Sequence, residues 1–147
     1  IPTVALYDRD VEGKYAKAHS NIFYTDEICF EMDFVTHLLS LRKRSIMDAI
    51  IKDIIDDARP MVTKDMARRG YAKLGITKNQ IVQRCLTNIS DRKLDDLHIY
   101  YFSWFYANKG VIVGRRISQF LEAEMIPPAF IAVIERAKAL SLGTNIY

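Results

Sequence analysis

The three histidines and two cysteines are the side chains from which a metal site would be expected. His19, His37 and His98 lie far apart, and none has a histidine or cysteine three or four residues away. Because zinc ligands recur at short spacings, the sequence predicts neither a metal nor a cofactor. Cys29 and Cys85 are too few for a disulfide framework. Each sits among apolar neighbours at helical spacing, which indicates buried free thiols and fits a reducing compartment.

Paired carboxylates are the other feature that could support catalysis. Asp56-Asp57 and Asp95-Asp96 are adjacent in the sequence. Neighbours on a helix point about 100° apart, so the two carboxylates of each pair do not converge on one atom. The sequence also lacks a Ser-His-Asp signature, a P-loop and a Gly-rich dinucleotide motif. It therefore predicts no catalytic residue, and an enzyme of unrecognised class stays only as an alternative.

A run of aromatic residues is the most unusual feature of the chain. Residues 97–106 read Leu-His-Ile-Tyr-Tyr-Phe-Ser-Trp-Phe-Tyr, and no charge falls between Asp96 and Lys109. As a helix this segment is apolar on every side, so it lies in a large core, against lipid or against another protein. In a chain of this size we interpret it as an assembly surface. The partner-binding residues that we predict here are Tyr100, Tyr101, Trp104 and Phe105.

Composition and charge bound the class of protein. With 147 residues, 50% of them hydrophobic and 27% charged, the chain fits one globular domain. Its net charge of +3 is too mild to indicate nucleic acid by itself. Residues 26–33 carry four anions and no cation, whereas residues 59–78 carry six cations and one anion. The basic segment fits an acidic protein surface, lipid head groups or nucleic acid, and equally a solvated connector between helices.

Two classes of partner can be weighed further. Single-strand stacking platforms combine aromatics with cations, and the aromatic run contains no Arg or Lys, so nucleic acid is not the expected partner. No stretch reaches the roughly 18–20 apolar residues of a membrane-spanning helix. Trp and Tyr nevertheless favour the membrane interface, so lipid contact at the surface stays open.

The pattern of caps and breaks predicts an all-α fold of six or seven short helices. Residues 1–24 are expected to form an irregular N-terminal arm, and residues 25–147 a single helical domain. Residues 111–113 are β-prone but isolated, and no alternating strand pattern occurs. Five of the expected helices begin after an N-terminal cap: after Thr25 and ending at about Leu41, after Ser45 and ending at about Arg59, after Thr63 and ending at about Gly70, after Thr77 and running through Leu86, and after Ser90 and ending at about Ala107. Two more are expected to span Arg115–Glu124 and Pro128–Leu140.

Two segments resemble a known family. Gly70-Tyr71-Ala72-Lys73-Leu74-Gly75-Ile76 resembles the Gly-aromatic-x-Lys-Leu-Gly-Leu segment of the ubiquinol–cytochrome c reductase binding protein family. Residues 128–138 are similar to its Pro-x-Leu-x-x-Val-Ile-x-x-x-x-Lys. The resemblance covers roughly residues 66–140. It departs where the family's second helix is rich in Arg and this chain has aromatics, and where the family's preceding Leu-Pro is missing. The first 60 residues have no counterpart.

The resemblance implies a non-catalytic accessory subunit of mitochondrial respiratory complex III. Members of that family lie peripherally on the matrix side of the inner membrane, pack against cytochrome b and the core subunits, and help assembly. Tyr71, Lys73 and Leu74 would then join the partner-binding residues. Two other functions stay open: a nucleic-acid-binding helical module, and a soluble regulator that binds a partner helix in a groove. Residues 110–115 faintly resemble a Gly-Val-x-x-Gly-Arg segment of Bcl-2-like proteins.

Overall fold

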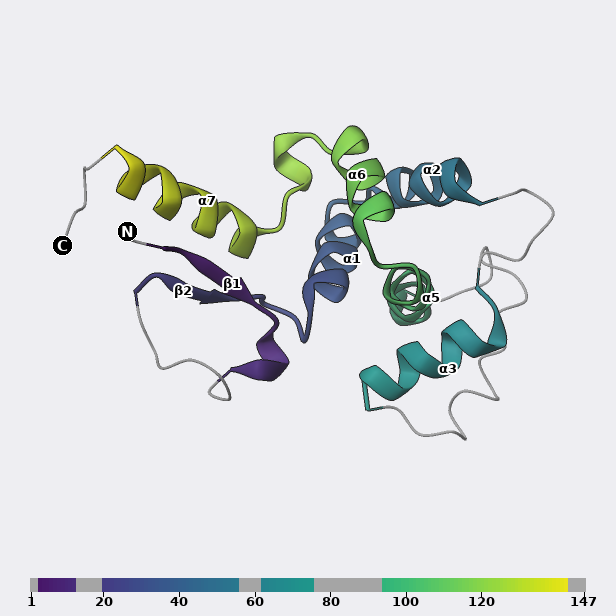
Figure 1. Ribbon diagram of the computed structural model, residues 1–147. Coiled ribbons are helices and arrows are strands. Elements are labelled where there is room, and N and C mark those ends of the chain that lie inside the picture. The colour runs from purple at the N-terminus through teal and green to yellow at the C-terminus, as the bar shows by residue number, and fades with distance from the viewer. Residues whose placement is uncertain (1–2, 13–19, 56–61, 76–93, 143–147) are drawn as a thin grey trace. The chain divides into compact units, whose positions relative to one another are not determined.

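The computed structural model describes residues 3–12, 20–55, 62–75 and 94–142. Across these residues it is mostly helical, with one small two-stranded sheet (Figure 1), so the prediction of an all-α chain of short helices is confirmed. The helices are α1 (Phe30–Ser40), α2 (Arg44–Ile54), α3 (Lys64–Lys73), α5 (Leu94–Ala107), α6 (Val111–Phe120) and α7 (Pro128–Ser141). The strands are β1 (Ala5–Tyr7) and β2 (Ile22–Tyr24), with short 3-10 turns η1 (Arg9–Val11) and η3 (Ala123–Met125).

The chain divides into two compact units. Unit 1 combines residues 1–37 with residues 122–147, and unit 2 is the continuous stretch 38–121. The boundary that we expected at residue 25 therefore falls inside unit 1.

Unit 1 is built around the sheet. The segment that we expected to be irregular contains β1 and β2, which pair in parallel with Ala5 opposite Ile22 and Tyr7 opposite Tyr24. Helix α7 packs against both strands. Strands of three residues are too short to show an alternating pattern, which is why the sequence did not reveal them. Pro128 is the first residue of α7, as predicted, because its fixed φ suits that position.

The start of α1 differs from the prediction, because Thr25 does not cap it. The Thr25 hydroxyl accepts from the backbone N–H of Arg9 at 3.0 Å and donates to the backbone carbonyl of Glu27 at 2.7 Å. Helix α1 begins later, at Phe30, whose backbone N–H donates to the Asp8 carboxylate at 2.9 Å. The carboxylate at this helix start thus comes from 22 residues earlier in the sequence.

Helix α2 also differs at both ends from the expected helix. Ser45 lies inside it, because α2 begins at Arg44, and the helix ends at Ile54, where Ile55 turns to an extended conformation. Residues 56–61 are not described. The boundary between α1 and α2 is a Schellman-type end in which Lys43 N–H donates to the Leu38 carbonyl at 2.8 Å and Arg42 takes a positive φ of 58°.

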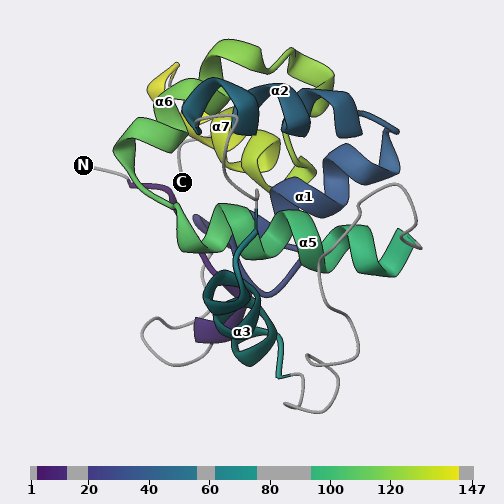
Figure 2. The same ribbon diagram turned by 90° about the vertical axis from the view of Figure 1, so that its right-hand side faces the viewer.

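The core of unit 2 includes the crossing of α3 and α5 (Figure 2). Thr63 caps α3 as predicted, since its side chain accepts from Met66 N–H. The expected stop near Gly70 is wrong, because the helix continues to Lys73. Gly70 is instead a point of close approach, where an added Cβ would lie 2.4 Å from the Ser103 hydroxyl oxygen and 3.1 Å from its Cα.

Helices α5 and α6 are joined by a short turn. Helix α5 ends at Ala107, as predicted. Helix α6 packs against α2 and begins at Val111, directly after Gly110 with φ 153°, so the β-prone residues 111–113 form its first turn. It ends at Phe120, earlier than expected. The predicted caps Thr77 and Ser90 lie outside the described residues.

Candidate binding surface

The predicted partner-binding aromatics lie in the interior. Tyr71, Tyr100, Tyr101, Trp104 and Phe105 are each at most 6% exposed, whereas Lys73 and Leu74 are partly exposed. Trp104 and Phe105 pack edge to face with ring centroids 5.0 Å apart, and Tyr100 and Tyr101 do so at 5.4 Å. A helix that is apolar on every side can lie in a core, against lipid or against another protein, and in the structure these side chains lie in the core. Contact of these side chains with a partner stays a prediction.

Tyr101 also links two helices of unit 2 through a polar contact. Its hydroxyl donates to the Asp48 carboxylate of α2 at 2.5 Å, and Arg44 lies 4.0 Å from the other Asp48 oxygen. Burial, followed by the bond to Asp48, raises the pKa of the Tyr101 hydroxyl well above its usual range. This tyrosine is therefore a neutral structural donor and not a reactive tyrosinate.

The charges of the chain divide between the two units. Unit 2 has 16 Lys and Arg against eight Asp and Glu, whereas unit 1 has five against ten. Unit 2 thus carries a net charge of +8 and unit 1 a net charge of −5. In the net charge of +3 these opposite signs cancel, and the acidic segment 26–33 and the basic segment 59–78 are local parts of the division. Counting charges by unit reveals the division, but the unit boundaries come from the fold.

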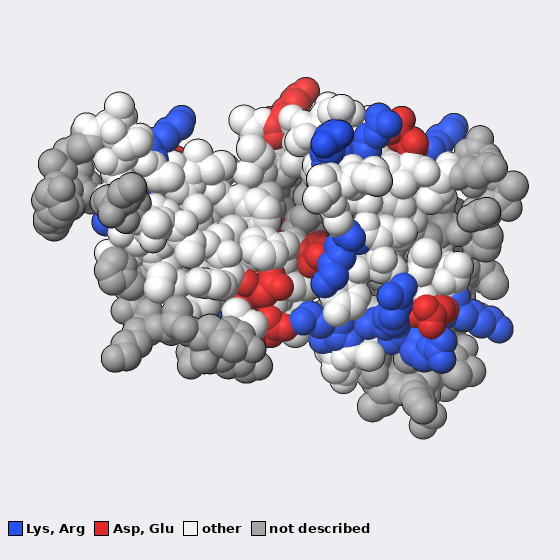
Figure 3. Space-filling view, in the orientation of Figure 1, with Lys and Arg blue, Asp and Glu red and all other residues white. Residues whose placement is uncertain are grey.

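Part of the positive charge of unit 2 lies on the outer face of α3. Lys64, Arg68 and Arg69 are exposed there, with Asp65 as the acidic residue of the helix. Arg68 donates to the Asp65 carboxylate at 2.6 Å, and Arg69 lies 3.4 Å from its other oxygen. One carboxylate therefore serves two guanidinium groups. On the face drawn in Figure 3, Lys and Arg gather over α3 and again over α2 and α6.

A second exposed feature, which we call the α5–α6 corner, consists of Tyr106, Lys109, Val111, Ile112 and Arg115. Val111 and Ile112 are 78% and 74% exposed, and among the large apolar side chains described only Leu142 of unit 1, at 75%, is comparable. Tyr106 stacks on Phe102 at 5.3 Å, and the Lys109 ammonium lies 4.7 Å from the Tyr106 ring centroid. The β-prone character of residues 111–113 did not indicate the exposure of Val111 and Ile112, which follow the turn at Gly110.

Helix α3 reaches this corner through the same ring. The Lys73 ammonium lies 6.0 Å from the Tyr106 centroid, so cations from two segments flank one aromatic side chain. Arg116, in contrast, pairs with Asp53 of α2 at 3.2 Å. The corner therefore combines exposed aliphatic groups with lysine and arginine side chains.

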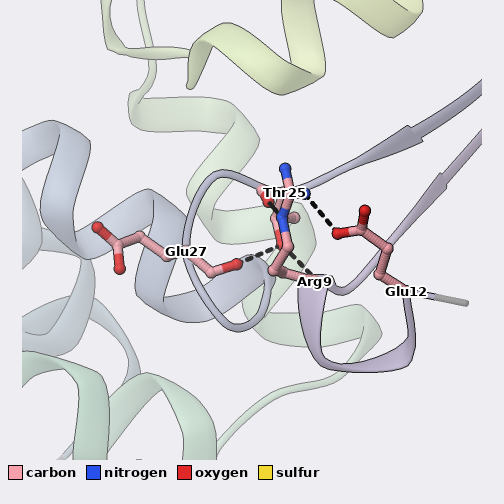
Figure 4. A network of polar contacts seen from close by, with 4 residues as sticks. All are labelled: Arg9, Glu12, Thr25 and Glu27. Carbon is pink, nitrogen blue, oxygen red and sulfur yellow. Dashed lines mark hydrogen bonds and ion pairs between the residues drawn. The ribbon is translucent and has the colours of Figure 1, made fainter.

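Unit 1 contains a polar network with a structural role (Figure 4). The Thr25 backbone carbonyl accepts a hydrogen bond from Arg9 Nε at 2.9 Å, in addition to the bond that the Thr25 hydroxyl accepts from Arg9 N–H. The Arg9 guanidinium also donates to the Glu12 carboxylate at 2.5 Å. Thr25 is fully buried, and the Arg9 guanidinium lies 5.6 Å from the Tyr24 ring centroid. These contacts fasten the η1 turn to the segment that precedes α1.

Unit 1 also contains two buried titratable groups, Cys29 and Asp33. Burial raises the pKa of the Cys29 thiol to about 12, with its backbone hydrogen bond opposing the shift, so Cys29 is an inert thiol. Asp33 is 4% exposed, and its pKa is raised by burial and by the nearby Asp26 carboxylate. Its Oδ2 atom has no hydrogen-bond partner, while Oδ1 accepts from Glu27 N–H at 3.4 Å.

The other candidate residues do not come together. His37 Nε2 lies 2.9 Å from the Glu124 backbone carbonyl, and His98 is on α5. Among the described residues no group of three His, Cys, Asp or Glu could hold a metal ion. His19, Cys85 and the pair Asp56-Asp57 lie outside the described residues, as do the side chains of the pair Asp95-Asp96.

No helix in the described part of the chain has both the length and the apolarity to cross a bilayer. The chain matches no protein-family model, no curated protein and no solved structure.

Proposed function

We propose that this chain is a non-catalytic binding subunit of a larger, membrane-associated assembly, with unit 2 as its contact surface. The observation that carries the proposal is the charge division, +8 in unit 2 against −5 in unit 1. A concentration of one sign of charge steers and orients a molecule on a partner of the opposite sign. The exposed cations of α3, which outnumber its acidic residue, supply such a face.

The use of the buried polar groups supports a binding role over catalysis. Thr25 and Ser103 bond backbone carbonyls, and Tyr101 bonds Asp48 between two helices. A nucleophile needs a base within hydrogen-bond reach and a third group that orients this base. These buried hydroxyls instead donate to acceptors that hold the fold together.

The resemblance of residues 70–76 and 128–138 makes respiratory complex III the specific assembly that we propose. In this proposal the chain lies peripherally on the matrix side of the inner membrane, against cytochrome b and the core subunits. The basic face of α3 would contact acidic side chains of those partners.

Co-purification tests the proposal. The chain, tagged at its C-terminus, is extracted from source membranes in mild detergent and separated on a native gel, and its companions are identified. Migration with cytochrome b and the core subunits is the expected result. Migration with a different membrane assembly would overturn the assignment to complex III, and migration alone would overturn the binding role.

A matched pair of charge reversals tests which face makes the contact. Lys64→Glu on α3 lies in the first helical turn, where a carboxylate favours the helix, so the fold is retained. We expect it to lower the co-purified fraction several-fold. Lys138→Glu changes an exposed lysine of α7 in unit 1 and alters the net charge equally, so it serves as the control. Equal loss in both variants would contradict a role for α3.

A further inference from the structure

We propose that the α5–α6 corner binds the surface of a bilayer that contains anionic lipids. Val111 and Ile112 enter the boundary between head groups and acyl chains, and Lys109 and Arg115 contact lipid phosphates. The inference deepens the proposed function, because it names the membrane surface as one partner of unit 2 and assigns the residues that touch it.

The apolar part of the corner consists of two neighbouring aliphatic side chains that are exposed. Val111 and Ile112 are 78% and 74% exposed, whereas Val113, the next residue, is 7% exposed. Helix α6 therefore already has a buried side, and the exposed pair lies outside it. Consecutive exposed aliphatic residues on a short helix are the side chains that interfacial helices place below the head groups.

The charged half is the purely positive charge of the sequence that surrounds this pair. Lys109 and Arg115 are exposed on either side of it in the sequence, and no Asp or Glu occurs between Asp96 and Glu122. Lysine and arginine near an anionic leaflet are each attracted by its negative surface potential. Arg116 pairs with Asp53 of α2 at 3.2 Å, whereas its neighbour Arg115 is exposed.

Tyr106 joins the two halves. It is partly exposed, Lys109 and Lys73 lie over its ring, and its phenol group is amphipathic. Tyrosine of this kind is enriched at the level of the lipid head groups. Lys109 is exposed, and its long side chain can move its ammonium group from the Tyr106 ring to a lipid phosphate.

The same surface fits lipid better than nucleic acid. The phosphate backbone of a nucleic acid would contact only the cations, and the exposed Val111 and Ile112 would have no role in such a contact. A base would need an open aromatic face, but Tyr106 is stacked on Phe102 at 5.3 Å with Lys109 over its ring. The aliphatic pair therefore decides in favour of a bilayer.

Sedimentation of the full chain with lipid vesicles tests the inference. One set of vesicles contains phosphatidylcholine alone, and the other contains phosphatidylcholine with phosphatidylserine. We expect binding to the second set that weakens as salt is raised. The double variant Val111→Ser with Ile112→Ser should bind about tenfold more weakly, since it removes the inserted groups and leaves every charge in place.

Leu142→Ser is the matched control, because Leu142 is 75% exposed at the end of α7 in unit 1. It should bind vesicles like the unmodified chain, and the thermal unfolding midpoints of all variants should agree because the changed side chains are exposed. Failure of the unmodified chain to bind anionic vesicles overturns the inference, as does undiminished binding by the double variant. Tight binding of a mixed-sequence oligonucleotide that is insensitive to the double substitution would identify nucleic acid as the occupant instead.

The inference and the proposed function can fail separately. The double serine variant leaves the basic face of α3 unchanged, so its co-purification with protein partners in detergent should persist. Loss of vesicle binding with retained co-purification supports the lipid role of the corner. Retained vesicle binding by a chain that co-purifies with nothing would refute the subunit role alone.

Discussion

Asp33 is a buried carboxyl group whose surroundings favour its neutral form. Its Oδ2 atom has no hydrogen-bond partner, and the bond that its Oδ1 atom accepts from Glu27 N–H is long at 3.4 Å. Burial is the larger cause of its raised pKa, and the Asp26 carboxylate adds to it. A charged Asp33 therefore destabilises the folded chain, because folding removes it from water without supplying a counter-charge.

Replacement of Asp33 by Asn should stabilise the chain at neutral pH. Between the ordinary Asp pKa and the raised folded value, the folded chain holds more protons than the unfolded chain, so stability falls as the pH rises. At neutral pH the penalty is larger than at acid pH, so Asp33→Asn should there have a higher free energy of unfolding than the unmodified chain. At about pH 3, below both pKa values, the gain should vanish. Urea unfolding at the two pH values measures the difference, and a pH-independent gain would contradict this reasoning.

For a single residue, the sequence predicts the role of the side chain when its hydrogen-bond partner is close in the chain. Thr63 caps α3 as expected, because its acceptor role involves Met66, three residues away. Thr25 has the same chemistry and was assigned the same role, but Arg9, 16 residues earlier, takes its hydroxyl oxygen. Nothing near Thr25 in the sequence distinguishes these two outcomes.

At the scale of elements, Gly70 sets how closely α3 and α5 can pack. Its hydrogen leaves space for the Ser103 side chain, whose hydroxyl donates to the Ile99 carbonyl at 2.7 Å within α5. A methyl group at Gly70 would meet the Ser103 backbone as well as its side chain. The two helices would then have to move apart.

Two glycine-to-alanine substitutions should therefore have opposite effects. Gly70→Ala should destabilise the chain by about 1–3 kcal/mol, the usual cost of overpacking. Gly114→Ala should stabilise it by about 0.5–1 kcal/mol, because Gly114 is exposed in α6 and an added Cβ meets nothing within 4 Å. Chemical denaturation of both variants provides the comparison. A loss in Gly114→Ala equal to that in Gly70→Ala would refute the close-approach explanation.

Element boundaries were predictable where a local signal acts alone. Pro128 begins α7 and α5 ends at Ala107, as expected. Gly70 was taken as a helix stop, because a glycine at a stop and a glycine at a helix crossing look the same without the partner helix. Residues 111–113 have β-branched side chains that favour strands, but packing of α6 on α2 overrides this preference.

At the scale of the whole molecule, the aromatic run shows what the sequence leaves undecided. Its lack of charge correctly indicates that residues such as Trp104 avoid water, and Trp104 is fully buried. The same pattern serves a core helix and a helix covered by a partner. The choice depends on whether the rest of the chain can cover the rings. Here the aromatic rings of residues 100–105 are buried, so the exposed candidates for a binding surface are α3 and the α5–α6 corner.

The unequal charge of the two units should be visible in ion exchange. Lys64→Glu and Lys138→Glu have identical net charge, but the first weakens the positive face of unit 2 and the second changes acidic unit 1. Because a charged surface responds to the local field more than to the total charge, Lys64→Glu should elute from a cation exchanger at lower salt. Coincident elution of the two variants would show that the chain presents only its average charge.

The packing of α7 on β1 and β2 has a consequence for synthesis of the chain. Unit 2 is continuous in sequence, whereas unit 1 combines a segment that is synthesised before unit 2 with a segment that is synthesised after it. Chains emerge from their N-terminus, so β1 and β2 are made before α7, the helix that packs against them. A premature stop before residue 128 would then leave these two strands without α7. A holding chaperone would find its binding site on these early strands and not on the central helices.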